Sequence, residues 1–373
     1  CTGTFMAPDG ANYLLRSCKK WSAGPAFAVA RVSADGLVDG TLDQFTHNTD
    51  FGWRNAGTNT FYVFGAFNDF LGVNSRRIAR VIPELTRHKA SYDFDGDGKS
   101  DLAVFRPSNS VWYLHRSTAG DQYIQWGLPS DKIVAGDANR DGKTDIGVFR
   151  NGAWHAFTSS SNIHLYACLG TTGDKPFVQN NYRDMDVTGD VFTVRGPRTG
   201  GMRWLVGNTG YGNCWTNPSQ FSFFVLADEV STDKPVSGDF NGDSIPEVGY
   251  FRDGYWYAAD SFLFQAPRAF QWGLAGDIPV PGDYDGDRQA DYAVYRPSTG
   301  DWWINRSTEG VIAVRFGIST DIPVPADYDG DGKMDIAIYR DGLWWQYLSA
   351  TGAVNVHQWG LAGDIPIPAQ NQY

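Results

Sequence analysis

Residues 327–335 read DYDGDGKMD, a nine-residue stretch with Asp at positions 1, 3, 5 and 9. The pattern returns as DFDGDGKSD at 93–101, DANRDGKTD at 137–145, DFNGDSIPE at 239–247 and DYDGDRQAD at 283–291. With a degraded copy, DMDVTGDVF, at 184–192, neighbouring copies start 44 to 55 residues apart. A recurrence of this length is typical of a repeat architecture in which each copy is one supersecondary unit.

Each loop lies in a constant frame of short apolar runs. After the copy at 283–291, runs at 292–295, 302–305 and 311–316 are separated by turn residues, and Ile278-Pro-Val-Pro precedes it. Four such strands in each repeat predict one blade of a β-propeller. Pro279 and Pro281 remove N–H donors from the same strand edge, so this strand should be the innermost strand of its blade.

The spacing favours an all-β fold, a single closed β-propeller of eight four-stranded blades, with seven blades as the alternative. Residues 88–373 would supply six blades plus a closing strand, and residues 1–87 two N-terminal blades of the same propeller. The last apolar run, 364–368, would complete a blade with N-terminal strands. The N- and C-termini would then close one blade and leave no exposed sheet edge.

The repeated loops predict about five calcium sites. Calcium takes six to eight oxygen ligands, and alternate Asp or Asn side chains around a Gly turn supply them. Position 12 is apolar or aromatic, so this is not an EF-hand, and magnesium is the less suitable ion. The expected ligands are Asp93, Asp95, Asp97, Asp101, Asp137, Asn139, Asp141, Asp145, Asp239, Asn241, Asp243, Glu247, Asp283, Asp285, Asp287, Asp291, Asp327, Asp329, Asp331 and Asp335. The degraded copy at 184–192 is expected to bind no ion.

The loops and their flanking phrases, GDYDGD at 282–287 and VYRPS at 294–298, resemble the FG-GAP/VCBS repeats of integrin-like propellers across residues 88–370. Residues 27–36, FAVARVSADG, together with 61–67 and 77–81, are similar to delta-60 propeller repeats, which also implies two blades there. The resemblance implies a propeller that carries calcium in its blade loops and serves adhesion or ligand binding outside the cell.

The four cysteines suit two disulfides in an oxidising compartment, most simply Cys1–Cys18 and Cys168–Cys214. Two alternatives stay open: acylation of Cys1, which would give a lipid anchor, and four buried thiols. The chain reads as a processed form, secreted or held at the cell surface. We expect no transmembrane segment, because no apolar run approaches the ~20 residues that span a bilayer.

The formal charge of −11 argues against nucleic acid or an anionic membrane as the partner. The six histidines fall at different blade positions and form no metalloprotease motif, and no nucleophile elbow is present. We therefore expect a non-catalytic binding or adhesion module for a glycan or a surface protein. The alternatives are a structural subunit that assembles with copies of itself, and a polysaccharide lyase or hydrolase.

Two recurring residue types have a structural and a functional interpretation. Trp recurs in the third strand of successive blades, where it would either pack between blades or stack sugars. Arg106, Arg150, Arg252, Arg296 and Arg340 end the second strands, where they would pair with carboxylates or form a ligand-binding ring. The longer insertion at 196–220 is the preferred place for specific recognition.

Overall fold

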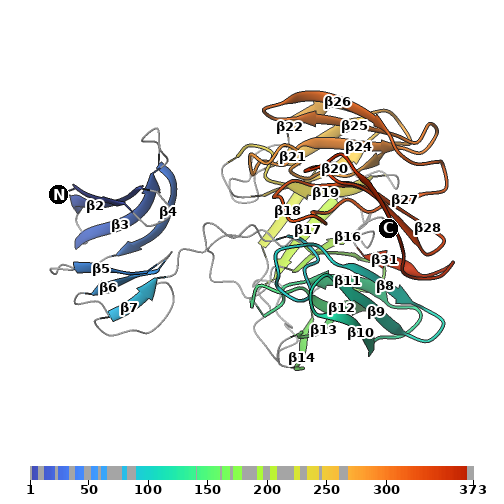
Figure 1. The fold of residues 1–373 in the computed structure, drawn as a ribbon, viewed down its shortest axis with the longest axis horizontal. Coiled ribbons are helices and arrows are strands. Elements are labelled where there is room, and N and C mark those ends of the chain that lie inside the picture. The colour runs from blue at the N-terminus through green and yellow to red at the C-terminus, as the bar shows by residue number, and fades with distance from the viewer. Residues whose placement is uncertain are drawn as a thin grey trace. The chain divides into compact units, whose positions relative to one another are not determined.

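The computed structural model describes seven strands within residues 2–81, and then residues 90–139, 141–159, 162–168, 171–178, 191–195, 202–207, 222–226, 233–242, 246–259 and 268–367. The chain divides into two compact units, Cys1–Arg87 and His88–Tyr373. Every element assigned in the described residues is a strand (Figure 1). Within these residues no helix has the length and apolarity needed to cross a membrane.

The first unit contains two antiparallel sheets, with strand orders β1-β2-β3-β4 and β5-β6-β7. Their strands are β1 (Thr2–Met6), β2 (Asn12–Trp21), β3 (Gly24–Val32), β4 (Val38–Phe45), β5 (Gly52–Gly57), β6 (Thr60–Phe64) and β7 (Ile78–Val81). β2 has 10 residues and β3 has 9, whereas most strands of the second unit have 4 to 6.

The second unit is a β-propeller with four-stranded blades. Five blades are each built from four consecutive strands. Their bounds are β11 (Lys132–Gly136), β12 (Asp145–Arg150), β13 (Ala153–Phe157), β14 (His164–Cys168); β15 (Lys175–Val178), β16 (Val191–Arg195), β17 (Met202–Gly207), β18 (Ser222–Leu226); β19 (Lys234–Gly238), β20 (Glu247–Arg252), β21 (Tyr255–Ala259), β22 (Arg268–Gln271); β23 (Ile278–Pro279), β24 (Tyr292–Arg296), β25 (Asp301–Arg306), β26 (Gly310–Arg315); and β27 (Ile322–Pro323), β28 (Ile336–Arg340), β29 (Leu343–Tyr347), β30 (Val354–Gln358).

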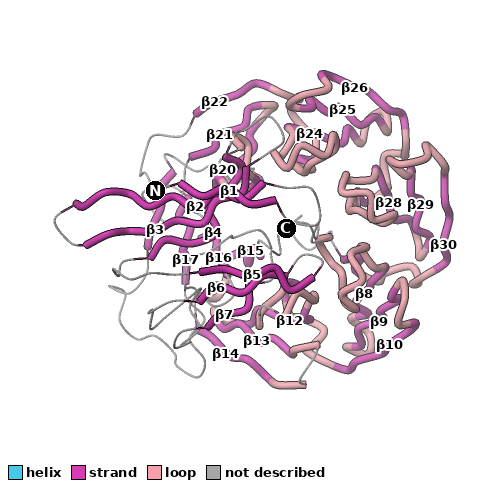
Figure 2. The backbone as a smooth tube through the Cα atoms, turned by 60° about the vertical axis from the view of Figure 1, so that its left-hand side comes forward, coloured by secondary structure: helices cyan, strands magenta, loops and turns pink. Residues whose placement is uncertain are grey.

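A further four-stranded sheet joins distant parts of the second unit. It combines β8 (Leu102–Arg106), β9 (Val111–Arg116) and β10 (Gly120–Gln125) with β31 (Ile365–Ile367), in the order β10-β9-β8-β31. β31 pairs antiparallel with β8, with Ile365 opposite Phe105 and Ile367 opposite Ala103. Figure 2 shows β8, β9 and β10, and likewise β28, β29 and β30, lying side by side in order from the inside of the ring to the outside.

The prediction of eight or seven blades closed by the two termini is therefore wrong. The 44-residue period, extended upstream of Asp93, predicts two blades in residues 1–87, but those residues form a separate unit with sheets of four and three strands. The last strand does not pair with the N-terminal strands either. It pairs with β8, whose own blade has no inner strand at residues 90–92.

Prolines mark two of the innermost strands as edge strands. β23 and β27 have two residues each and lie at the end of their sheets. In β23, Pro279 stands opposite Val294, and the following Val280 N–H still donates to the Ala293 carbonyl at 2.8 Å. A strand whose alternate residues lack an N–H can pair along one side only, so it must be an edge strand.

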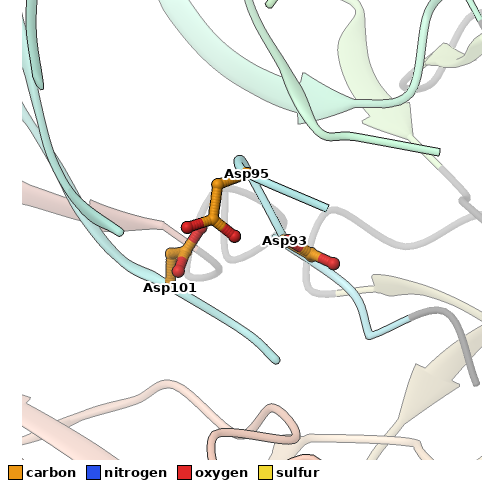
Figure 3. Close-up of side chains that lie close together, drawn as sticks. All are labelled: Asp93, Asp95 and Asp101. Atoms are coloured by element: carbon orange, nitrogen blue, oxygen red, sulfur yellow. The ribbon is translucent and has the colours of Figure 1, made fainter. Parts of the chain in front are cut away.

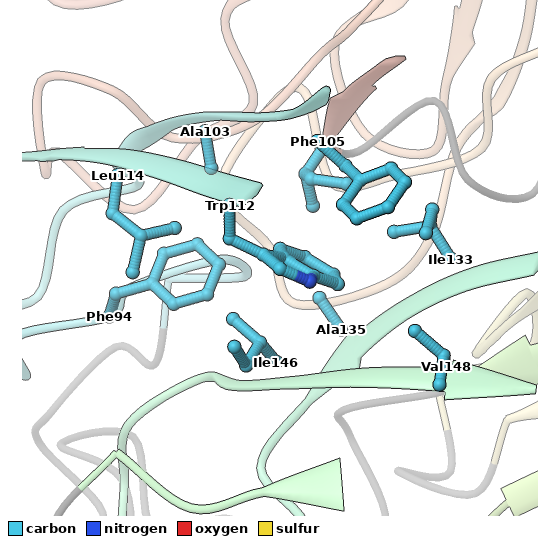
Figure 4. Close-up of a cluster of buried hydrophobic side chains, with 10 residues drawn as sticks. Phe94, Ala103, Phe105, Trp112, Leu114, Ile133, Ala135, Ile146 and Val148 are labelled. Atoms are coloured by element: carbon cyan, nitrogen blue, oxygen red, sulfur yellow. The ribbon is translucent and has the colours of Figure 1, made fainter. Parts of the chain in front are cut away.

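The core lies between neighbouring blades. Figure 4 shows Trp112 of β9 among Phe105 of β8, Ile133 of β11 and Ile146 of β12, all in one buried cluster. Trp112 and Phe105 meet edge to face, with ring centroids 5.6 Å apart. The interpretation of the third-strand tryptophans as packing residues is confirmed where their side chains are described: Trp112, Trp154, Trp256, Trp302 and Trp344 are buried.

Candidate metal centres

Three of the five loops bring three carboxylates together at positions 1, 3 and 9. In each, one oxygen from every residue lies within 4.8 Å of the others. Figure 3 shows the first group, Asp93, Asp95 and Asp101. The equivalent groups are Asp283, Asp285, Asp291 and Asp327, Asp329, Asp335. Each loop comes directly before the second strand of its blade, so the position 9 residue directly precedes, or begins, that strand.

Backbone N–H groups of the loop fix the position 1 carboxylate. Asp93 Oδ1 accepts from Gly96 N at 2.5 Å, and Oδ2 accepts from Gly98 N at 2.8 Å. Gly96 and Gly98 have φ of 82° and 95°, which glycine adopts without steric cost. Asp327 has the same arrangement, and in the loop at 283–291 Arg288 replaces the second glycine at φ 74°. The Asp-Gly spacing therefore curls the loop around the first carboxylate.

The hairpin between the third and fourth strands holds the other carboxylates. Ser117 N donates to Asp101 Oδ1 at 2.7 Å, and Ser117 Oγ donates to Asp97 Oδ2 at 2.6 Å. Thr118 N donates to Asp95 Oδ2 at 3.0 Å. Position 5 is thus tied to the hairpin and is not part of the three-carboxylate group. The sequence analysis missed these hairpin residues, although a Ser recurs there as Ser117, Ser159, Ser307 and Ser349.

Hydrogen bonds also join the loops of neighbouring blades. The position 1 carbonyl of one loop accepts from the position 8 N–H of the next: Asp93 from Thr144, Asp239 from Ala290, Asp283 from Met334 and Asp327 from Ser100, all at 2.6–2.7 Å. The last of these bonds connects the final loop of the chain to the first. It therefore lies at the same junction that β31 closes.

The loop at 283–291 contains a buried carboxylate oxygen that accepts no hydrogen bond. Asp285 Oδ1 is buried and has no hydrogen-bond partner, while its Oδ2 accepts from both the N–H and the Oγ1 of Thr308. Asp283 and Asp291 each place an oxygen near it. Leaving a buried charged acceptor unsatisfied costs free energy, and a cation held by the three carboxylates would satisfy it.

Burial also perturbs the position 9 carboxyls. Burial raises the pKa of Asp101 to about 7, and raises those of Asp145, Asp291 and Asp335 to about 6. The neighbouring Asp95 adds to the effect at Asp101 by like-charge repulsion. An ion between the carboxylates would remove this repulsion and hold them deprotonated.

The loops at 137–145 and 239–247 share only part of the hydrogen bonding of the three loops that carry carboxylate groups. Asp137 accepts from Asp141 N and Gly142 N, each at 3.0 Å, as position 1 does elsewhere. Asn139 Nδ2 donates to Asp141 Oδ2 at 2.9 Å. In the other loop, Glu247 accepts from Phe240 N at 2.7 Å and from the Asn241 amide. Asp243, residues 184–190 of the degraded copy and the insertion at 196–220, apart from β17, lie outside the described residues, so those predictions remain untested.

The arginines that end the second strands are structural. Arg296 donates from Nε and one Nη to Asp277, both at 2.9 Å, and the Asp277 side chain is almost fully buried. Equivalent pairs are Arg150–Asp131, Arg252–Asp233, Arg340–Asp321 and Arg106–Asp364. The last pair joins β8 to the residue before β31. The interpretation as carboxylate partners is confirmed for all five arginines.

An aromatic cluster lies where the β27–β30 blade meets β9 and β10. Trp359 donates from Nε1 to the Tyr113 carbonyl at 3.0 Å, and its ring stacks with Tyr123 at a centroid distance of 6.2 Å. His115 lies 5.0 Å from Trp359 and its Nδ1 is 2.6 Å from Asp121. Tyr123 is 59% exposed. The cluster therefore places an exposed aromatic ring beside polar groups.

A family model described as FG-GAP-like repeat matches residues 93–148 and 283–338. Each match begins at the first Asp of a loop and ends within a second strand of the following blade. The chain carries FG-GAP-like repeats. A comparison with curated proteins finds no match.

Several solved structures are similar to this chain. An Agrocybe aegerita lectin, studied for its recognition of non-reducing terminal N-acetylglucosamine, is 14% identical, with a TM-score of 0.43, over 71% of this chain and 77% of its own. The Cps50 β-propeller domain of Myceliophteria thermophila is 9% identical, with a TM-score of 0.40, over 70% and 86%. Virginiamycin B lyase of Staphylococcus aureus is 9% identical, with a TM-score of 0.38, over 95% and 93%. Likenesses this weak do not carry over what these proteins bind or cleave.

Proposed function

We propose that the FG-GAP-like loops bind calcium and that the chain is an extracellular, non-catalytic binding module. The observation that supports calcium most directly is the buried, unpartnered Oδ1 of Asp285 beside two further carboxylates. Oxygen-only donors and a Gly turn suit calcium, and the affinity range of extracellular calcium modules matches millimolar calcium outside cells. The two expected disulfides would also favour an extracellular location. Each proposed pair includes a cysteine outside the described residues, Cys1 or Cys214.

In this proposal calcium has a structural role. Each ion would connect its loop with the hairpin between the third and fourth strands. In the loop at 93–101, that hairpin holds Asp101 through Ser117 and Asp95 through Thr118. Carboxylates that coordinate a cation are poor general bases, because the ion keeps them deprotonated and occupied. The rigid blades would then present ligand-binding surfaces.

The described surface that best suits a ligand is the cluster of Tyr113, Tyr123, His115 and Trp359. Exposed aromatic rings beside hydrogen-bonding groups suit a glycan, whose C–H faces stack on aromatics while its hydroxyls pair with polar groups. A surface protein is the alternative ligand. This assignment rests on the exposure of Tyr123 and on its stacking with Trp359.

Glycan binding can be tested on an array with the pure chain, in calcium and in EDTA. We expect binding to at least one glycan class in calcium, and loss of most of it in Tyr123→Ala. Phe270→Ala is the matched control, because Phe270 is an exposed aromatic on the outer strand of another blade. Equal binding by both variants would contradict the assignment of the cluster. Degradation of polysaccharides in the same panel would contradict the non-catalytic role.

Self-assembly is a second candidate, because the outer strands have unpaired edges with exposed apolar residues. Val311 of β26 and Val354 and Val356 of β30 are 47–54% exposed. Unpaired edges of this kind can add a strand from another chain. Ordered filaments or layers of the pure protein in negative-stain micrographs would support this candidate, and a monomer at all concentrations would exclude it.

A further inference from the structure

Two histidines that are far from any motif in the sequence share one face of the β11–β14 blade. β13 and β14 pair antiparallel, with His155 opposite Tyr166 and Phe157 opposite His164. Residues two apart on a strand point to the same side, so His155 and His164 are diagonal neighbours on one face. His164 is exposed and His155 is partly buried, so the pair is accessible to solution.

The imidazole nitrogens stand at the separation of two ligands of one ion. His155 Nδ1 and His164 Nε2 are 3.2 Å apart, and the two rings are nearly parallel, at 12°. Two nitrogens bound to tetrahedral zinc at ~2.0–2.1 Å lie about 3.3 Å from each other. We propose that His155 Nδ1 and His164 Nε2 form a binding site for a zinc ion, with the remaining positions filled by water.

The surroundings hold the pair in place. The Trp126 ring meets His164 edge to face at 5.0 Å and lies 5.2 Å from Phe157, while Tyr166 lies 4.9 Å from His155. Rings fixed by neighbours lose little freedom when they bind an ion, which favours affinity.

Burial and the nearby charges favour the neutral form of His155, which is the form that binds a metal ion. Burial lowers the pKa of His155, and the Arg150 charge and His164 add to this. Asp131 acts in the opposite direction, and it also forms a bidentate ion pair with Arg150, so the guanidinium charge near the site is compensated. Zinc needs the neutral imidazole, so binding should weaken as the pH falls below the histidine range.

The donor set separates this site from the carboxylate loops. Imidazole suits zinc, copper and nickel, whereas calcium takes oxygen ligands. A nitrogen separation of 3.2 Å fits tetrahedral ligands better than adjacent ligands of a square-planar copper ion, which lie about 2.8 Å apart. In the ion-free chain the two nitrogens share a hydrogen bond across this distance, and zinc would take the place of its proton.

Zinc binding should be measured by calorimetry on the full chain, stripped of metal and then kept in millimolar calcium so that zinc does not compete for the loops. We expect His155→Gln and His164→Gln each to weaken zinc binding by about tenfold or more. His357→Gln is the control, because His357 is a single exposed histidine on β30. Cobalt in place of zinc should give the visible absorption of a tetrahedral ion, which both site variants should lose.

Zinc affinity that stays within about twofold in both site variants, or that His357→Gln lowers equally, would overturn the proposal. His164→Gln keeps the test decisive if His155→Gln does not fold, because His164 is exposed. Its melting temperature in calcium, without zinc, should match that of the unaltered chain.

Discussion

Asp285 is the residue whose environment most favours a bound ion. Its Oδ1 is buried without a partner, while Oδ2 is fully used by Thr308 and Glu309. Asp285→Asn should remove one calcium ion per chain. It should also lower the free energy of unfolding in calcium by about 2–3 kcal/mol, the contribution of a site at roughly 100-fold saturation.

In EDTA, Asp285→Asn should no longer lower the free energy of unfolding. Asn removes a charge that repels Asp283 and Asp291, so the calcium-free variant should be at least as stable as the unaltered chain. Denaturant unfolding in both conditions measures the two values. Asp301→Asn, a carboxylate on β25 outside the loop, is the control. A variant that is equally destabilised in calcium and in EDTA would show that Asp285 does not act through an ion.

The raised pKa values of the position 9 carboxyls set a pH dependence for the calcium-free protein. Asp101 has a pKa of about 7 in the folded chain, and Asp291 and Asp335 about 6, against 3.8 for an unperturbed Asp. Folding therefore takes up protons between about pH 4 and 7. This stabilisation is complete below the unfolded pKa and is lost as the pH rises through 6 to 7.

In EDTA, the melting temperature should therefore rise as the pH is lowered from about 8 to 5, and Asp101→Asn should flatten that slope. In saturating calcium the trend should reverse, because protons compete with the ion. Thermal melts at a series of pH values measure both slopes. A melting temperature in EDTA that falls over the same pH range would contradict the assigned burial of these carboxyls.

Among single residues, the carboxylates that come together in three of the loops could be predicted, because their spacing repeats along the sequence. The serines that hold them could not, because Ser117 contacts Asp97 and Asp101 only through the register of the β9–β10 hairpin. His155 and His164 likewise meet only through the pairing of β13 with β14. Such pairings follow from turn geometry and not from residue type.

β31 is the element that joins the two ends of the second unit, and Arg106–Asp364 is its ion pair. Arg106→Leu would leave the buried Asp364 carboxylate without its guanidinium, which should cost about 3 kcal/mol. Hydrogen exchange should then increase at Ile365 and Ile367. Arg296→Leu removes the same pair within one blade, with Asp277, and should not affect β31.

If hydrogen exchange in β31 is equally slow in both variants, the Arg106–Asp364 ion pair does not contribute to closure of the second unit. A stronger perturbation is removal of residues 364–373, which bares the β8 edge along Ala103 and Phe105. The truncated chain should aggregate, because an unpaired apolar edge can pair with another chain. A truncated chain that stays monomeric, with unchanged unfolding, would contradict the role of β31.

The inner strands could be predicted from their prolines, and the packing of Trp112 and its equivalents from their recurrence once per blade. The partner of the last strand could not. Asp364 precedes β31 as Asp277 precedes β23, so the repeat shows that an inner strand ends the chain but not which second strand is free. That strand is β8, because no strand forms at residues 90–92.

At the level of the whole chain, the 44-residue repeat does not continue into residues 1–87 as predicted. Residues 1–87 lack the Asp loops, and their long strands form two sheets of a separate unit. Their delta-60-like character remains a prediction. The five recurring loops lie in the second unit, so calcium should stabilise that unit and leave the first largely unaffected.

Calcium binding by the loops is the proposal on which the expected role of the second unit depends most. Calcium bound to the full chain should be counted by equilibrium dialysis with elemental analysis, alongside thermal melts in calcium and in EDTA. We expect about five ions per chain, one for each intact loop, and a second-unit transition that moves to a clearly lower temperature in EDTA. A chain that binds no calcium, and whose melting temperature is the same in both conditions, would contradict the account.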